Sequence, residues 1–280
     1  MYLCGYLHRD PSLGNFLMIP EGKGFEEKES KEKGFKIPEV FYTDLTSLEV
    51  EDEKKTKIKS QCKKVEQLVA KIGISDEYSA VITDGDLAVK LKDYWEQGRQ
   101  AAKLVRDILV TEKPGLDGLQ GTPEFMSRQL LFAKGDDYLH SPVDDLESFF
   151  WVALWSIFFN VKSGENWEAE QRLRDALIGN HKSYTMDTLF ESLVVNKGRN
   201  NVTRRFQDVI DEWWVKVQRR HRKWSSEVIL DAPGNAGSSY YLPFFHSYAL
   251  QGVLDILEVL ADHWNGEISW KSWTGPDLPT

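Results

Sequence analysis

The chain has 280 residues, of which 41% are hydrophobic, enough to bury one large core or two modest ones, and this excludes a wholly disordered protein. Its formal net charge of −9 argues against a nucleic-acid or anionic-membrane surface over the whole molecule. The two cysteines, Cys4 and Cys62, are too few for a disulfide framework and lack metal-ligand spacing. We therefore expect a globular protein of a reducing compartment without structural zinc.

The N-terminus argues against a signal peptide, and the most apolar stretch argues against a membrane-spanning helix. Residues 1–7 lack the basic start and the apolar length of a signal peptide. The longest uncharged apolar stretch, residues 148–161, is shorter than the ~20 residues that a spanning helix needs. We expect an intracellular protein, cytoplasmic or nuclear, with no membrane partner.

Residues 20–70 are unusually rich in Lys, Glu and Asp. Such a composition buries little apolar area, so the first part is expected to be a solvated or disordered loop, with a charged docking segment as the alternative. Further along, apolar residues recur at steps of four and three, which predicts one buried stripe of an amphipathic helix. These residues are Ile58, Cys62, Val65, Val69 and Ile72.

A short strand and a second helix follow. The run Ala80-Val81-Ile82-Thr83 is the clearest strand pattern in the chain. Apolar residues at helical spacing predict a helix over about 92–110, ended by Pro114 and Gly115.

The helix expected over 142–160 is the best-marked element. Ser141 is a suitable N-cap, Pro142 suits the first helical position, and Asp144 and Asp145 lie in the first turn, where the helix dipole favours negative charge. After Glu147 the sequence is apolar on every face, which predicts a central buried helix surrounded by neighbours.

Further helices are expected near 165–178, 184–194, 200–223 and 245–263. Nine of the ten tryptophans lie from Trp151 onward, so the main core should be C-terminal. The last helix has an apolar stripe made of Leu250, Val253, Leu254, Leu257 and Leu260.

The segment from His8 to Asn15 reads H-R-D-P-S-L-G-N, the spacing of a protein-kinase catalytic loop. In such a loop Asp10 accepts the proton of the attacking hydroxyl, and the amide oxygen of Asn15 reaches a magnesium ion on the nucleotide phosphates. The alternative is a polar turn.

A second acidic segment follows the strand at 80–83. The sequence Asp84-Gly85-Asp86-Leu87-Ala88 matches the position of the metal-binding D-F-G segment, so Asp84 would hold the metal. A plain turn is one alternative. A phosphatase of the D-x-D type is another, but its partner motifs are not found.

A third segment reads G-T-P-E-F-M-S-R-Q-L-L over 121–131, followed by D-D-L-E-S-F-F over 144–150. With the first two, this ordered set resembles the C-terminal lobe of the fungal-type protein kinase family. The resemblance implies that Asp10 is the catalytic base, that Asn15 and Asp84 are the ligands for Mg²⁺ and ATP, and that Arg9 steadies the activation segment. It also implies that Asp145 holds the backbone of the catalytic loop.

The sequence departs from the family pattern at several places. Pro11 follows the expected base directly, which biases Asp10 toward an extended backbone and removes an N–H. Gln129 stands where the family has a glutamate, so a charge-assisted bond is lost although the amide can still hydrogen-bond. Asp84 lies 69 positions after Asn15, which makes residues 20–75 a charged insertion. Only seven residues precede His8, so no glycine-rich loop or strand lysine is expected, and the N-terminal lobe is missing.

Basic residues gather in the helix over 199–223, where three acidic residues oppose eight basic ones. This basic helix could bind a phosphorylated or acidic partner. A nucleic-acid surface is disfavoured against the solvated face of an amphipathic helix. The basic residues are Arg199, Arg204, Arg205, Lys216, Arg219, Arg220, Arg222 and Lys223. The histidines after His8 show no i, i+4 pairing and no carboxylate partner that would suggest a metal site, and we expect them to be structural or exposed. They are His140, His181, His221, His246 and His263.

The sequence therefore predicts a mainly α fold over residues 1–280: a protein-kinase-like C-terminal lobe of the α+β kinase superfamily without its β-rich N-terminal lobe. The resemblance implies a transferase that phosphorylates protein hydroxyls from Mg-ATP if a nucleotide-binding lobe is supplied. The alternative is a catalytically inactive, truncated pseudokinase that acts as a protein-interaction module.

Overall fold

The computed structural model describes residues 6–7, 16–18, 35–48, 50–73, 80–82, 89–90, 125–132, 140–158, 201–233 and 238–263. This part of the chain is mainly helical, as predicted. The helices expected over 92–110, 165–178 and 184–194 lie outside the described residues, as does the early part of the charged segment, 20–34.

Within the described ranges, four short strands form two antiparallel pairs. β1 (Tyr6–Leu7) pairs with β4 (Val89–Lys90), and β2 (Phe16–Met18) pairs with β3 (Ala80–Ile82). The strand predicted at 80–83 is thus confirmed as β3. Each pair joins a strand near the N-terminus to one more than sixty positions later.

Two helices occupy the chain between β2 and β3. α1 spans Glu39–Ser47 and α2 spans Asp52–Ile72, which ends at Gly73 in the left-handed conformation (φ 72°) that a glycine C-cap adopts without strain. The predicted stripe from Ile58 to Ile72 is buried along α2. α1 was not expected from the charged composition, and it buries Phe41 and Leu45.

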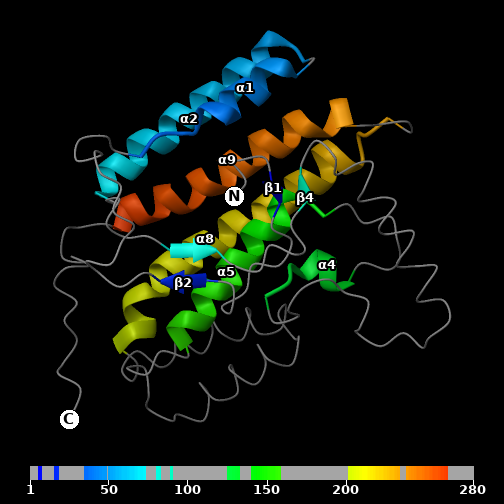
Figure 1. Cartoon of the computed structure of the whole chain (residues 1–280). Helices are drawn as coiled ribbons and strands as arrows, with labels where there is room; N and C mark the ends of the chain where they lie inside the picture. Colours follow the sequence, from blue (N-terminus) through cyan, green and yellow to red (C-terminus); the bar gives the residue numbers. More distant parts are fainter. Residues whose placement is uncertain are drawn as a thin grey trace.

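The remaining helices are α4 (Arg128–Phe132), α5 (Pro142–Phe158), α8 (Asn201–Trp224), its π-helical continuation η5 (Ser225–Ile229), and α9 (Ser238–His263). α9 begins before the predicted position 245 and contains Pro243. In Figure 1, α9 runs between α2 on one side and α8 and α5 on the other. None of the described helices is long and apolar enough to cross a membrane.

Apolar packing joins these helices in three clusters. The first unites α1 and α2 with α9 and includes Leu45, Ile58 and Leu254. The second unites α5 with α8 and contains Phe150, Trp151 and Trp214, with the rings of Phe150 and Trp214 stacked at 5.0 Å. The third is built around Trp224 and Phe245, where α8 and η5 meet α9. α9 therefore takes part in two of the three clusters.

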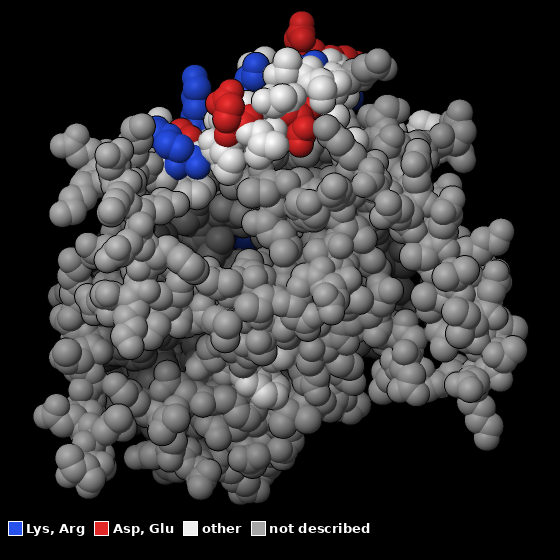
Figure 2. Space-filling model, viewed as in Figure 1, with Lys and Arg blue, Asp and Glu red and all other residues white. Residues whose placement is uncertain are grey.

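The solvent side of α1 and α2 carries both signs of charge. Figure 2 shows Lys and Arg side chains beside Asp and Glu side chains at the edge where Figure 1 places these two helices. Lys54 and Glu51 form one such pair at 3.6 Å. The described helices of the charged segment, α1 and α2, thus have one solvated face and one buried face. The earlier part, for which a loop is expected, lies outside the described residues.

Gly252 lies at a close contact between α9 and α5. A Cβ atom added at this position would overlap Leu146 Cδ1 and would lie 3.0 Å from its Cγ and Cδ2 atoms. The absence of a side chain therefore lets the two helices pack.

We predict that Gly252→Ala lowers the free energy of unfolding by about 1–3 kcal/mol, because the new methyl group overpacks this contact. Urea denaturation followed by tryptophan fluorescence measures the change. The same substitution in a Leu146→Ala background should cost less, since the overlapping atoms are gone. An equal cost in both backgrounds would contradict the packing argument.

Candidate functional site

Four of the five predicted site residues, Arg9, Asp10, Asn15 and Asp84, lie outside the described residues. The strands that flank them are described. β1 ends at Leu7, β2 begins at Phe16, directly after Asn15, and β3 ends at Ile82, two positions before Asp84.

The registers of the two strand pairs link the ends of the two motif segments. Leu7 pairs with Val89, and Phe16 pairs with Ile82. Leu7 and Phe16 flank the segment 8–15, and Ile82 and Val89 flank the segment 83–88. The residues that flank the two motif segments are therefore paired with one another. The two motifs are about seventy positions apart in the sequence, but the strand residues on both sides of one motif pair with those on both sides of the other.

The fifth predicted site residue, Asp145, lies in the first turn of α5. Its Oδ1 is 2.8 Å from Nε2 of His140, and both residues are buried. Its expected contact with the catalytic-loop backbone stays a prediction, since residues 8–15 lie outside the described part.

The neighbouring Asp144 is fully buried (0% exposed). Its Oδ2 accepts hydrogen bonds from the backbone N and the Oγ of Ser141, both at 2.8 Å, and its Oδ1 accepts one from Ser127 Oγ. Ser127 Oγ in turn accepts a bond from the backbone N of Leu130 at 3.1 Å. Asp144 thus caps the N-terminus of α5, and through Ser127 it connects α5 to the start of α4.

Glu147, also 0% exposed, is the centre of a larger network. Its Oε1 accepts hydrogen bonds from the backbone N of Arg128 at 3.0 Å, from Arg128 Nε at 3.2 Å and from Trp151 Nε1 at 3.0 Å. Its Oε2 lies 2.6 Å from Nε2 of His221 on α8. One carboxylate therefore joins α4, α5 and α8.

The electrostatics of this pair favour charge on both partners. Burial alone would raise the pKa of Glu147, but the bond and the charge from His221, with a contribution from Arg128, outweigh it and lower the pKa to about 2. Burial alone would lower the pKa of His221, whereas the bond to Glu147 and its charge, with that of Asp144, raise it. The two groups form a buried ion pair near neutral pH.

Two further contacts hold α4 against the C-terminal helices. The Arg128 guanidinium lies over the ring of Trp214 at 4.4 Å from its centroid, a cation–π arrangement. Gln129 Nε2 donates a hydrogen bond to Ser225 Oγ at 3.3 Å. The neutral amide at the family's glutamate position thus does hydrogen-bond, as expected from the sequence.

Three of the histidines have carboxylate partners that the sequence did not reveal. His140 faces Asp145, His221 faces Glu147, and His263 Nε2 lies 3.2 Å from Glu212 Oε2. These partners come together through the fold and not through local spacing. Within the described ranges, no group of three or more His, Cys, Asp or Glu residues is placed to hold a metal.

The sequence analysis also missed the roles of Glu147, Ser127 and Arg128. A signal was present, because Glu147 is the last charged residue before a run that is apolar on every face. A charge carried into a fully buried helix has to be paired. Its partners could not be identified, because His221 is 74 positions away.

Comparison with known protein families finds a match. The family model of the fungal protein kinases matches residues 1–157, more than half of the chain. Searches of curated proteins and of solved structures found no match.

We predict that Glu147→Gln lowers the free energy of unfolding by about 3–5 kcal/mol, because it leaves Arg128 and His221 without their negative partner. Chemical denaturation measures this loss. Glu53→Gln, an exposed change in the first turn of α2, is the control and should cost less than about 0.5 kcal/mol. Equal effects of the two variants would contradict the network.

The same pair predicts a pH dependence. A histidine whose folded pKa is raised contributes stability that is fully present below about pH 6.5 and is lost as the pH rises through the folded pKa. Glu147 stays ionised over this range because its pKa is about 2. The stability advantage of the wild type over His221→Gln should therefore be larger at pH 5.5 than at pH 9, measured from urea unfolding curves. A difference that does not change with pH would contradict the assignment.

Proposed function

Because the chain belongs to the fungal protein kinase family, we propose that it transfers the γ-phosphoryl group of Mg-ATP to a serine or threonine hydroxyl of a protein when a nucleotide-binding lobe is supplied. The observation that carries this proposal is the register of the strand pairs, Leu7 with Val89 and Phe16 with Ile82. It supports a shared location for the catalytic-loop motif and the acidic metal motif.

Asp10 is the proposed general base. Its carboxylate would accept the proton of the attacking hydroxyl, and a base positioned in this way contributes about 10²–10⁴-fold to the rate. Arg9 beside it would steady the activation segment, and Asp145 would hold the backbone of the loop.

Asn15 and Asp84 are the proposed magnesium ligands. An amide oxygen and a carboxylate suit Mg²⁺, which prefers oxygen donors. When bound, the ion neutralises negative charge on the nucleotide phosphates. Phe16 and Ile82 are partners in the register of β2 and β3. Asn15 is one position from Phe16, and Asp84 is two positions from Ile82. Because so few residues separate each ligand from its paired neighbour, the distance between the two ligands is limited.

The anchoring of α4 supports the same proposal. In the family pattern this segment closes the activation segment next to the protein substrate. Here Ser127, Arg128 and Gln129 are each bonded to α5 or to η5. The lost family glutamate is therefore compensated by hydrogen bonds that keep this end of the segment fixed.

The second candidate is an inactive kinase-like module that binds other proteins. The observation that favours it is Pro11, which follows the proposed base and biases Asp10 toward an extended backbone. The two candidates differ in whether Mg-ATP is bound and used.

We predict that the protein, supplied with a nucleotide-binding lobe and assayed with Mg-ATP and a serine- and threonine-containing protein substrate, loses at least about 100-fold in phosphate transfer on Asp10→Asn. Stabilisation by Mg-ATP in a thermal-shift assay should survive this change and should disappear in Asp84→Ala. Asp52→Asn, an exposed change at the start of α2, is the matched control and should alter neither readout. If the wild-type protein shows no transfer and no Mg-ATP shift with the nucleotide-binding lobe supplied, the proposal is overturned in favour of the binding module.

A further inference from the structure

A polar cavity of about 340 Å³ lies where α2, α8 and α9 meet. Five cationic side chains line it: Lys57 from α2, and Lys216, Arg219, Arg220 and Lys223 from α8. Three acidic side chains oppose them: Glu227, Asp255 and Glu258. The lining therefore carries a formal charge of +2 in a protein whose net charge is −9.

Two of the cations are neutralised within the lining. Arg220 pairs with Asp255, with Nε 3.2 Å from Oδ2, and Lys216 Nζ lies 3.1 Å from Oε2 of Glu258. Burial alone would raise the pKa of Glu258, but hydrogen bonds from Lys64 and Lys216 lower it. These pairs tie α8 and α2 to α9 and form the fixed wall of the cavity.

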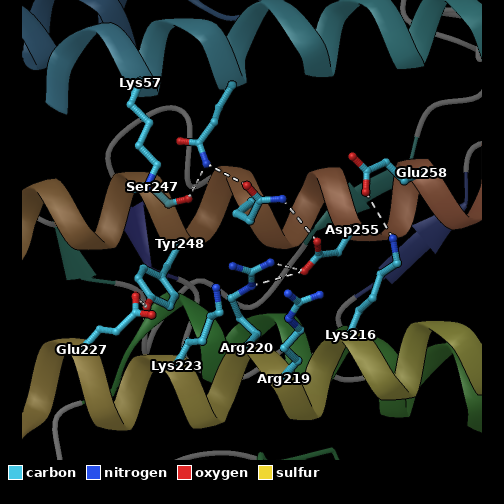
Figure 3. A pocket seen from close by; sticks show the side chains of 12 residues that line it. Lys57, Lys216, Arg219, Arg220, Lys223, Glu227, Ser247, Tyr248, Asp255 and Glu258 are labelled. Carbon is cyan, nitrogen blue, oxygen red and sulfur yellow. Dashed lines mark hydrogen bonds and ion pairs between the residues drawn. The ribbon is translucent and has the colours of Figure 1, made fainter. Parts of the chain in front are cut away.

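The other three cations, Lys57, Arg219 and Lys223, have no ion-pair partner among the residues that the structure describes. Figure 3 shows Lys57 extending from α2 toward α9, while Arg219 and Lys223 extend from α8 toward α9 across the cavity. Positive charge from two separate helices thus converges on one space.

A buried polar frame supports this space. Gln61 Nε2 donates hydrogen bonds to the carbonyl oxygen of Ser247 at 3.2 Å and to Gln251 Oε1 at 3.1 Å. Gln251 Nε2 donates to Asp255 Oδ1 at 3.3 Å. Gln61 is only 7% exposed, it lines the cavity, and its Oε1 has no hydrogen-bond partner in the described structure. Such an acceptor suits an N–H donor of a ligand.

We propose that this cavity binds the phosphate group of a phosphorylated peptide segment. A phosphorylated side chain carries about −1.5 to −2 charges and three acceptor oxygens, which complements a lining of +2 with three unpaired cations. A carboxylate carries half of that charge. The backbone N–H groups of a peptide supply the donor that Gln61 Oε1 lacks.

The tryptophans of α8 argue against a surface that stacks on the bases of a nucleic acid. Trp214 and Trp224 are 4% and 1% exposed and lie in the apolar clusters, and Trp213 is half-buried with its ring edge-on to Phe150 at 5.2 Å, whereas single-strand binders present exposed aromatic rings. A volume of about 340 Å³ is also at the small end of ligand pockets. Both facts favour one phosphorylated side chain over a nucleic-acid strand.

The test is fluorescence anisotropy with three probes: a short labelled phosphoserine peptide that is otherwise uncharged, its unphosphorylated form, and inorganic phosphate as a competitor. The phosphopeptide should bind the full chain saturably, and the unphosphorylated peptide at least about tenfold more weakly. Arg219→Ala and Lys223→Ala should each weaken phosphopeptide binding by about tenfold.

Arg222→Ala is the matched control. Arg222 is a basic, exposed residue of the same helix, but it does not line the cavity, and its Nε donates to the carbonyl oxygen of Gln218 at 3.4 Å. It should leave binding unchanged. Three results would overturn the proposal: no saturable binding, an equal loss in Arg222→Ala, or inorganic phosphate bound as tightly as the phosphopeptide, which would assign the cavity to free phosphate. Phosphate transfer is a separate readout, so failure here leaves the proposed function untouched.

Discussion

Two carboxylates buried at the start of α5 constrain the rest of the described structure. Asp144 and Glu147 are both 0% exposed, and charges removed from water have to be compensated by hydrogen bonds or opposite charges. Asp144 is satisfied by the N-cap residue and by Ser127. Glu147 is satisfied by Arg128 and Trp151 and by the ion pair with His221. The position of α4, the first turn of α5 and the path of α8 are therefore coupled, because moving any one of them leaves a charge unpaired. The apolar clusters pack the same helices together, and these polar contacts add the requirement that each buried charge meets its partner.

α1 and α2, which lie between β2 and β3 in the sequence, pack on the C-terminal helices. α1 and α2 pack through one apolar stripe onto α9, which also contacts α5 and α8. α9 thus has a partner on both sides (Figure 1). Polar residues of α2 and basic residues of α8 line one cavity together with residues of α9, and this is the cavity proposed to bind phosphate.

Local patterns in the sequence predicted a good part of this structure. The stripe from Ile58 to Ile72, the capped start of α5 and the strand at 80–82 all follow from periodicity or from end signals that act within a few residues. α1 was missed because only two of its side chains are buried among charged neighbours. The start of α9 was placed too late, since the helix continues through Pro243, which usually ends one. The network around Glu147 and the pairing of Phe16 with Ile82 are long-range, and no local pattern encodes which distant residues will meet. The residues of the candidate site were predicted from motif spacing and family resemblance. The pairing of the strands that flank the two motifs was seen only in the structure.

The central claim is that the segments 8–15 and 83–88 are held together at both ends by the two strand pairs. A direct measurement is disulfide formation between cysteines placed at paired positions. Leu17 and Val81 are partners in the register of β2 and β3, and partner Cα atoms of antiparallel strands lie about 4.5–5.5 Å apart, within the range that a disulfide spans. Under mild oxidation, with Cys4 and Cys62 replaced by serine, Leu17→Cys/Val81→Cys should cross-link efficiently. Leu17→Cys/Ile82→Cys, one position out of register and directed to the opposite face, should not. Equal cross-linking of both pairs, or none in either, would contradict the proposed site.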